Sequence, residues 1–293
     1  MSSFVLKMIA VISMVVDHLA VVLYGRGFPS WNMYLYMRAF GRLAFPLYCF
    51  LLVNGFEKTS DKKRYLSRLL MFAAISQIPF SMVFADANYG EIGLVTSLGT
   101  YYPMLPFLLL CLIAVLAYLL FWNKSPSVIW LALALLCGQV TLQYKGYVLF
   151  GQELSVFYTL SLGFASVAVL DGYLSQRLTL WTALPRAAIA ILLICMFQGR
   201  IDYEYLGVLL IVSLYLCRND RKAQMAAMVL WCCAYYRFMA VQLFCFSFIT
   251  ALLILFYNGE RGGPKQGGTL IKWGFYVIYP LHLLALGLAN ILF

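Results

Sequence analysis

The sequence predicts an all-α polytopic integral membrane protein, a single domain over residues 1–293 with about nine to eleven transmembrane helices. Apolar residues make up 64% of the chain and charged residues only 11%, against roughly a quarter charged in a soluble domain. The apolar residues stand in long blocks without the alternation of barrel strands. Because lipid accepts only helices or closed barrels, these blocks indicate helices.

Eleven segments are candidates for these helices. The first, 4–24, contains Asp17 and His18 and is followed by no small-residue cleavage site, so we expect a retained span rather than a signal peptide. The remaining candidates are 39–56, 67–85, 103–122, 127–143, 154–174, 179–197, 203–217, 223–237, 240–257 and 270–292. Three of them, 127–143, 203–217 and 223–237, are short for a span, which sets the lower limit of the count.

Charged loop residues predict the orientation. With the N-terminus inside, the basic residues between Lys58 and Arg68, between Arg218 and Lys222, and between Arg261 and Lys272 all fall on the cytoplasmic side. The net charge of +10 therefore reflects membrane topology, and we expect lipids and no nucleic acid as partners. The eight cysteines lie in apolar segments without CxxC spacing, so neither a metal site nor a disulfide framework is expected.

Five ionisable residues within the predicted spans are candidates for a functional site, because such a group in lipid costs at least a few kcal/mol and commonly marks a functional path. They are Asp17, His18, Arg42, Arg186 and His282, while Arg38 and Asp202 stand at span ends. His18 follows Lys7 by about 16 Å of helix, and His282 follows Lys272 by about 15 Å. Both imidazoles should therefore lie near the midplane, and we expect Arg42 to pair with Asp17.

A histidine in a membrane can also serve packing alone, through a hydrogen bond worth ~1 kcal/mol. For His282 and Arg186 the structural and functional interpretations stay equally open. For His18, which follows Asp17 and faces a helix carrying Arg38 and Arg42, we favour function.

Four stretches together resemble the TraX family, typified by the pilin acetylation protein of conjugative plasmids. They are LKMIAVISMVVDHLAVVLYG (6–25), MRAFGRLAFPLYCFLLVNGFEKTSDKKRYLSRLLMFAAISQIPF (37–80), DYEYLGVLL (202–210) and KWGFYVIYPLHLL (272–284). The segment QELSVFYTLSLG (152–163) is similar to the middle of the family pattern, whereas residues 86–150 look like an insertion.

The resemblance implies a bacterial cytoplasmic membrane protein that is distantly similar to acyltransferases using cytosolic acetyl-CoA. Those relatives share a basic residue, ten intervening residues and a histidine in their first helix, which Lys7 and His18 match. The resemblance therefore implies that His18 is the catalytic residue and that Arg38 and Arg42 belong to the site. Acetyl-CoA would be a co-substrate with no permanently bound cofactor, and the acceptor would be an envelope peptide, glycan or lipid; a pilin substrate is not carried over.

Acyl transfer from a thioester needs a base and donors for the developing oxyanion. His18 suits the first task, oriented by Asp17 or another polar group, and it could alternatively carry the acyl group itself. For the oxyanion the candidates are Arg42, Tyr276 and Tyr279. We expect the charged CoA phosphates at Lys7, Arg38, Arg68 and Lys272, and the acceptor near Asp202, Tyr203, Tyr276, Tyr279 and His282.

Two other classes of protein are consistent with the residues alone. A secondary transporter or lipid flippase would also carry ionisable groups at the midplane, and a scaffold subunit would need none. The candidate site residues gather on the first, second and last spans without visible repeat symmetry, which favours the enzyme.

Overall fold

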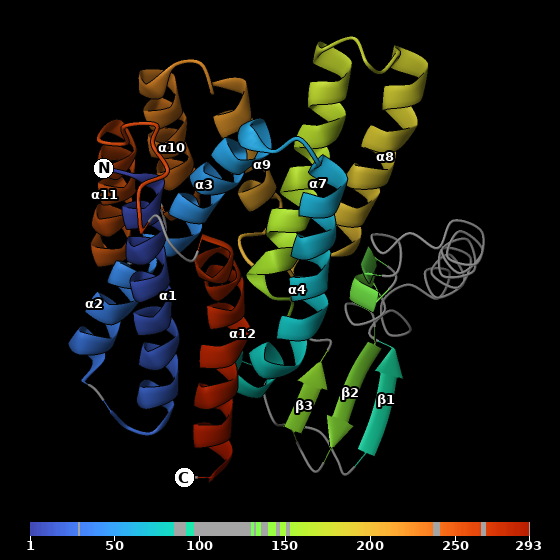
Figure 1. The fold of residues 1–293 in the computed structure, drawn as a ribbon. Helices are drawn as coiled ribbons and strands as arrows, with labels where there is room; N and C mark the ends of the chain where they lie inside the picture. Colours follow the sequence, from blue (N-terminus) through green and yellow to red (C-terminus); the bar gives the residue numbers. More distant parts are fainter. Residues whose placement is uncertain are drawn as a thin grey trace.

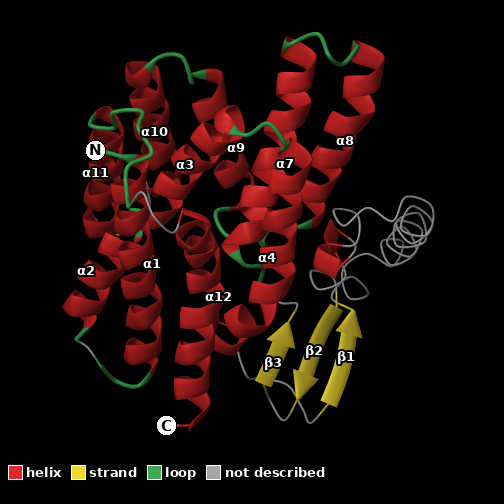
Figure 2. Cartoon of the chain, in the orientation of Figure 1, coloured by secondary structure: helices red, strands yellow, loops and turns green. Residues whose placement is uncertain are grey.

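The computed structural model describes residues 1–28, 30–84, 92–96, 130–131, 133–135, 140–144, 147–150, 153–236, 241–264 and 268–292. The fold is a bundle of α-helices, as predicted, with one small sheet beside it (Figures 1 and 2). Among the described residues, four helical stretches are long and apolar enough to cross a membrane, and three further apolar helices are shorter. The chain is therefore a multi-pass membrane protein.

The N-terminal half supplies four helices: α1 (Ser3–Gly25), α2 (Trp31–Gly41), α3 (Ala44–Lys58) and α4 (Lys62–Phe84). The predicted span 39–56 is in fact part of a longer stretch, Trp31–Lys58, in which a turn at Arg42 and Leu43 separates α2 from α3. Side chains at the end of α2 therefore reach the interior of the bundle.

The C-terminal half contains α7 (Val156–Leu174), α8 (Leu180–Met196), α9 (Glu204–Leu216), α10 (Arg221–Tyr236), α11 (Val241–Leu255) and α12 (Gly268–Leu292). Each coincides with a predicted span to within a few residues. The last helix, α12, packs most extensively on α4 and also against α1, so the two ends of the sequence meet in the bundle (Figure 1).

Between α4 and α7 lies an antiparallel sheet of β1 (Ile92–Thr96), β2 (Val140–Tyr144) and β3 (Tyr147–Phe150). Its register pairs Leu94 with Leu142 and Tyr144 with Tyr147. The predicted span 127–143 is therefore wrong at its end, because residues from Val140 onward belong to β2, and the β-branched Val140 and Thr141 favour extended backbone. The predicted span 103–122 lies outside the described residues.

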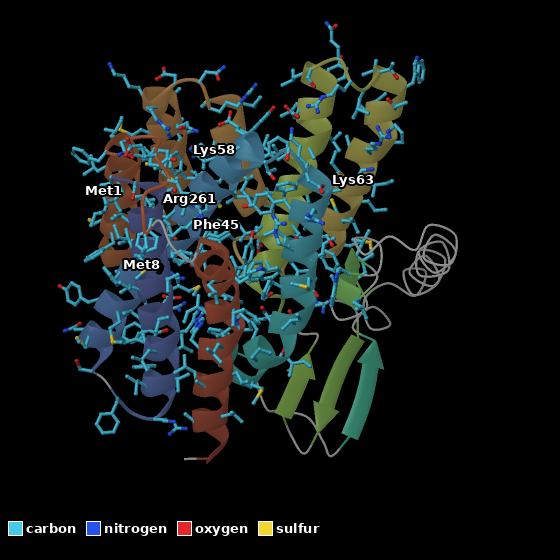
Figure 3. The ribbon with its side chains drawn as sticks, viewed as in Figure 1. Met1, Met8, Phe45, Lys58, Lys63 and Arg261 are labelled. Atoms are coloured by element: carbon cyan, nitrogen blue, oxygen red, sulfur yellow. The ribbon has the colours of Figure 1, made fainter. Side chains whose placement is uncertain are left out.

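One end of the bundle gathers the N-terminus and the basic connections. The segment Met1–Phe4 pairs with the loop before α12, because Ser3 N–H donates to the Glu260 carbonyl at 2.9 Å and Phe4 N–H to that of Arg261 at 3.0 Å. Lys58, Lys63 and Arg261 lie in this upper part of Figure 3, whereas the chain ends at the opposite end in Figure 1. The described loops thus follow the predicted separation of charges between the two ends.

Candidate active site

The two histidines of the protein face each other inside the bundle. His18 on α1 and His282 on α12 lie with their ring centroids 5.0 Å apart and their planes 8° from parallel. The His18 Nδ1 and the His282 Nε2 are 2.7 Å apart, a hydrogen-bond distance. The predicted common depth of the two rings is thereby confirmed.

The second nitrogen of His282 fixes the tautomers. His282 Nδ1 lies 2.7 Å from the Ile278 carbonyl oxygen, which can only accept a hydrogen bond. For two neutral rings, His282 therefore carries its proton on Nδ1 and accepts at Nε2, and His18 must donate from Nδ1. This network leaves the lone pair of His18 on Nε2, the arrangement that a general base needs.

A contact within α12 holds His282 in this position. Pro280 stands inside α12 and lacks the N–H that would bond the carbonyl of Tyr276, four residues earlier. The His282 ring folds back one turn to the Ile278 carbonyl. The segment Tyr-Pro-Leu-His at 279–282 thus aims an imidazole across at α1.

Asp17 binds two arginines beside the histidines. Arg38 Nη1 lies 2.8 Å and Arg42 Nη1 3.5 Å from Asp17 Oδ2. The predicted Asp17–Arg42 pair is confirmed, with Arg38 as the closer partner. Gly41 makes the approach of α2 to α1 possible, because a Cβ there would lie 2.3 Å from the Asp17 side chain.

A cavity of about 260 Å³ lies next to this group, and we call it the His18 cavity. Charged and aromatic side chains share its wall, which is formed by Met14, Asp17, His18, Arg38, Gly41, Arg42, Ala44, Phe45, Tyr48, Phe80, Phe84, Glu153, Val156, Asp202, Tyr203, Tyr235 and Tyr279. Asp202 belongs to the turn between α8 and α9, outside the helices. Burial raises the pKa of Asp202 to about 7, against the opposing influence of the nearby Arg42 guanidinium.

A second cavity of about 430 Å³ lies towards the basic end of the bundle, and we call it the basic cavity. Lys7, Lys58, Arg68 and Arg261 line it together with Gly262 and Gly263. Both glycines have positive φ, and added Cβ atoms would collide with Ser2 and Phe4, so the N-terminal segment packs directly on this loop. Cations and backbone turns of this kind favour anions.

The two cavities share three wall residues, Tyr48, Val156 and Tyr279. Tyr279 lies on α12 one turn before His282, and its ring centroid is 6.0 Å from that of His18. The two cavities therefore adjoin at these three residues, close to His18.

Most predicted site residues line one of these cavities. Lys7 and Arg68 line the basic cavity, and Asp202 and Tyr203 line the His18 cavity. Tyr276, which was expected near the acceptor, lines the basic cavity instead, and His282 lines neither cavity. Arg38 was expected on the donor side but lies in the His18 cavity, because Asp17 draws it inward. The side chain of Lys272 lies outside the described residues, and Arg186 is exposed on α8 and lines neither cavity.

Sequence reasoning missed some lining residues. Arg261 belongs to the segment 259–268, which its glycines mark only as a loop, and Lys58 was interpreted chiefly as a topology signal. Tyr48 and Val156 carry no charge and follow no motif, so only their location between the cavities identifies them.

Comparison with known proteins places the chain. The sequence profile described as "TraX protein" matches residues 2–150 and 146–290, nearly the whole length. The chain belongs to the TraX family. The first matched segment includes residues 86–150, which we had expected to be an insertion.

A relative of this TraX-family chain is the probable fimbrial assembly protein FimC, serogroup H1, of Dichelobacter nodosus. The two are 44% identical over 84 residues, which are 29% of this chain and 33% of the relative. The matching part thus spans about a third of the length of that relative. No solved structure matches the chain.

Proposed function

We propose that this TraX-family protein is an integral membrane acetyltransferase that uses acetyl-CoA from the cytoplasm. The observation that carries the proposal is the hydrogen-bonded series from His18 through His282 to the Ile278 carbonyl, with His18 in the wall of the His18 cavity. It supplies an oriented base inside the membrane, where an ionisable ring without a task is costly. The family resemblance of Lys7 and His18 to acetyl-CoA-dependent acyltransferases points the same way.

The basic cavity is the proposed donor site. Lys7, Lys58, Arg68 and Arg261 offer cations for the phosphates of CoA, with Arg suited to bidentate contacts. Tyr276 and Tyr279 follow along α12 towards His18, so the pantetheine arm would place its thioester near the shared wall. The proposal requires the N-terminal end of the bundle to face the bacterial cytoplasm, which is the side that the basic loop residues favour.

The His18 cavity is the proposed acceptor site. At about 260 Å³ it is smaller than the roughly 300–1,000 Å³ of pockets for drug-sized ligands. It therefore suits one terminal group of an envelope peptide, glycan or lipid. Asp202 and Tyr203 would bind that group by hydrogen bonds, and Asp17 with its two arginines lines the same cavity.

The reaction follows from this placement. The acceptor hydroxyl or amine attacks the thioester carbon while His18 Nε2 takes its proton. The tetrahedral intermediate then collapses, the C–S bond breaks, and the CoA thiolate leaves and receives the proton from His18. His282 stabilises the transient imidazolium of His18 by accepting from its Nδ1–H.

Transfer of a labelled acetyl group in proteoliposomes tests the proposal. Proteoliposomes that contain the wild-type protein are mixed with radiolabelled acetyl-CoA and with membrane extract from a deletion strain. The extract should then become labelled. With His18→Ala, labelling should fall by about 10²–10⁴-fold, while acetyl-CoA still binds. Lys63→Ala is a matched control, because Lys63 is exposed at the same end and lines neither cavity.

Donor binding has its own test. Arg68→Ala or Arg261→Ala should weaken acetyl-CoA binding, and the difference from wild type should shrink as the salt concentration rises, because salt screens the charges. Lys63→Ala should bind acetyl-CoA like the wild type. Equal labelling by wild type and His18→Ala would refute the mechanism. Accumulation of a solute or movement of a lipid without any labelled product would instead establish the transporter or flippase alternative.

A further inference from the structure

The N-terminus of α7 meets Tyr279 at the boundary of the two cavities. Val156 is the first residue of α7, and both Val156 and Tyr279 line both cavities. The next residue of the helix, Phe157, packs edge-on against the Tyr279 ring with centroids 5.1 Å apart. The amide of Val156 faces the Tyr279 hydroxyl.

Polar atoms at this boundary are buried and lack partners. The Tyr279 side chain is 4% exposed, and its hydroxyl oxygen faces the Val156 amide, while the described residues offer no acceptor for its own O–H. Ser155 precedes α7 in the N-cap position, where a serine side chain ordinarily accepts from a helix amide. It makes no such bond, and its Oγ is buried without a partner in the described part of the chain.

Buried donors of this kind cost free energy unless a ligand satisfies them. A helix begins with amides that have no acceptor within the helix, and the helix dipole adds partial positive charge at the same place. Gln77 holds this helix start in position: its Oε1 accepts from the Ser155 amide at 3.2 Å, and its Nε2 donates to the Glu153 carbonyl. The donors are thus fixed before any substrate arrives.

We propose that the Val156 amide at the start of α7 and the Tyr279 hydroxyl bind the carbonyl oxygen of the acyl thioester and stabilise the oxyanion formed from it. The inference rests on the proposed acetyl transfer and assigns the electrophile's position within it. His18 lies on the adjacent side, with its ring centroid 6.0 Å from that of Tyr279. The base and the oxyanion donors would therefore act on the same carbonyl carbon from neighbouring positions.

The chemistry balances without a further reactant. Attack by the acceptor moves the carbonyl π electrons onto oxygen, where the Val156 amide and the Tyr279 O–H donate hydrogen bonds to the negative charge. The charge returns to re-form the C=O bond as the C–S bond breaks and the thiolate departs. Arg42, the charged alternative for this task, already lies at 3.5 Å from Asp17.

Tyr279→Phe tests the assignment, since it removes the hydroxyl and keeps the ring. Loss of one oxyanion donor should lower kcat by about 10²–10³-fold, while acetyl-CoA still binds with the wild-type Kd. The matched control is Tyr236→Phe, because Tyr236 is also fully buried with an unpartnered hydroxyl among the described residues but lines neither cavity. Its kcat should stay within about threefold of wild type.

Infrared spectroscopy gives a readout that does not depend on turnover. In His18→Ala protein, the carbonyl band of acetyl-CoA labelled with ¹³C at the acetyl carbonyl should shift to lower frequency on binding. The shift should become smaller when Tyr279→Phe is added, because only the Val156 amide then remains as donor, and it should keep its full size with Tyr236→Phe. A wild-type kcat together with an unchanged shift in Tyr279→Phe would overturn the oxyanion site alone. A wild-type protein that neither binds nor transfers acetyl groups would overturn this inference together with the proposed function.

Discussion

His282→Ala provides a direct test of how the two histidines work together. In the wild type, His282 accepts a hydrogen bond from His18 Nδ1 over 2.7 Å and is itself held by the Ile278 carbonyl. The substitution removes this acceptor and leaves Nδ1–H of His18 inside the bundle, where His18 is only 8% exposed. The ring is then free to rotate or to change tautomer, and either change withdraws the lone pair on Nε2 from the acceptor substrate.

The structure bounds the size of the effect. Leaving a buried donor unsatisfied costs about 1–3 kcal/mol, and each 1.36 kcal/mol corresponds to a factor of ten in rate. We therefore expect His282→Ala to lower kcat by about 10–100-fold, less than the loss of His18 itself. His282→Gln should recover part of the rate, because its amide oxygen can accept from the same nitrogen.

Acetyl transfer to membrane extract, measured for the single and double variants, decides the point. If His282 acts only through His18, the His18→Ala/His282→Ala protein should be no slower than His18→Ala, a fully non-additive cycle. Gel filtration of each variant in detergent controls for folding. Additive losses in the double variant, or a Gln variant as slow as Ala with intact folding, would show that His282 does not orient His18.

Four further outcomes follow from the described contacts. Gly41→Ala should destabilise the protein by about 1–3 kcal/mol, because the added Cβ would overpack against Asp17. Gly25→Ala is the control, since a Cβ there would meet nothing within 4 Å, and it should leave the midpoint of unfolding in detergent unchanged. Equal unfolding midpoints for the two variants would contradict the close approach of α2 to α1. Asp17→Ala should lower the free energy of unfolding by about 3–5 kcal/mol, because it leaves two arginines without a carboxylate. Arg42→Ala should lower it less, because Arg38 remains 2.8 Å from Asp17. The reverse ranking in chemical unfolding would refute this prediction. Because the pKa of Asp202 is raised to about 7 in the folded state, the folded state should lose stability relative to the unfolded state as pH rises from about 4 to 7. Asp202→Asn should remove that loss, which thermal unfolding at pH 5 and pH 8 measures. Parallel pH profiles of the two proteins would contradict this prediction. Reporter fusions at Asp61 and at Phe28 should report opposite sides of the membrane, with Asp61 in the cytoplasm; a shared side would remove one crossing between them.

The helices could be predicted because their pattern is local. Nearly every apolar block from 154 onward became a helix with bounds close to those predicted, since lipid leaves the backbone almost no other choice. The sheet could not be predicted in the same way. The residues of β2, Val140–Tyr144, are as apolar as the end of a span, and only their pairing with β1 and β3 decides their conformation.

The candidate site shows a sharper division between local and long-range information. Helical spacing from Lys7 and Lys272 gave the depth of both histidines, because rise per residue is fixed within one helix. The hydrogen bond between them depends on how α12 rotates and packs against α1, over a separation of 264 residues, and no local rule contains that rotation. The same limit explains Arg38: its position in the sequence suited a phosphate, but Gly41 lets α2 approach α1 closely enough for Asp17 to bind it. A charged side chain in the membrane interior thus pairs with the nearest opposite charge. For Asp17, helix packing rather than distance along the sequence decides that this partner is Arg38.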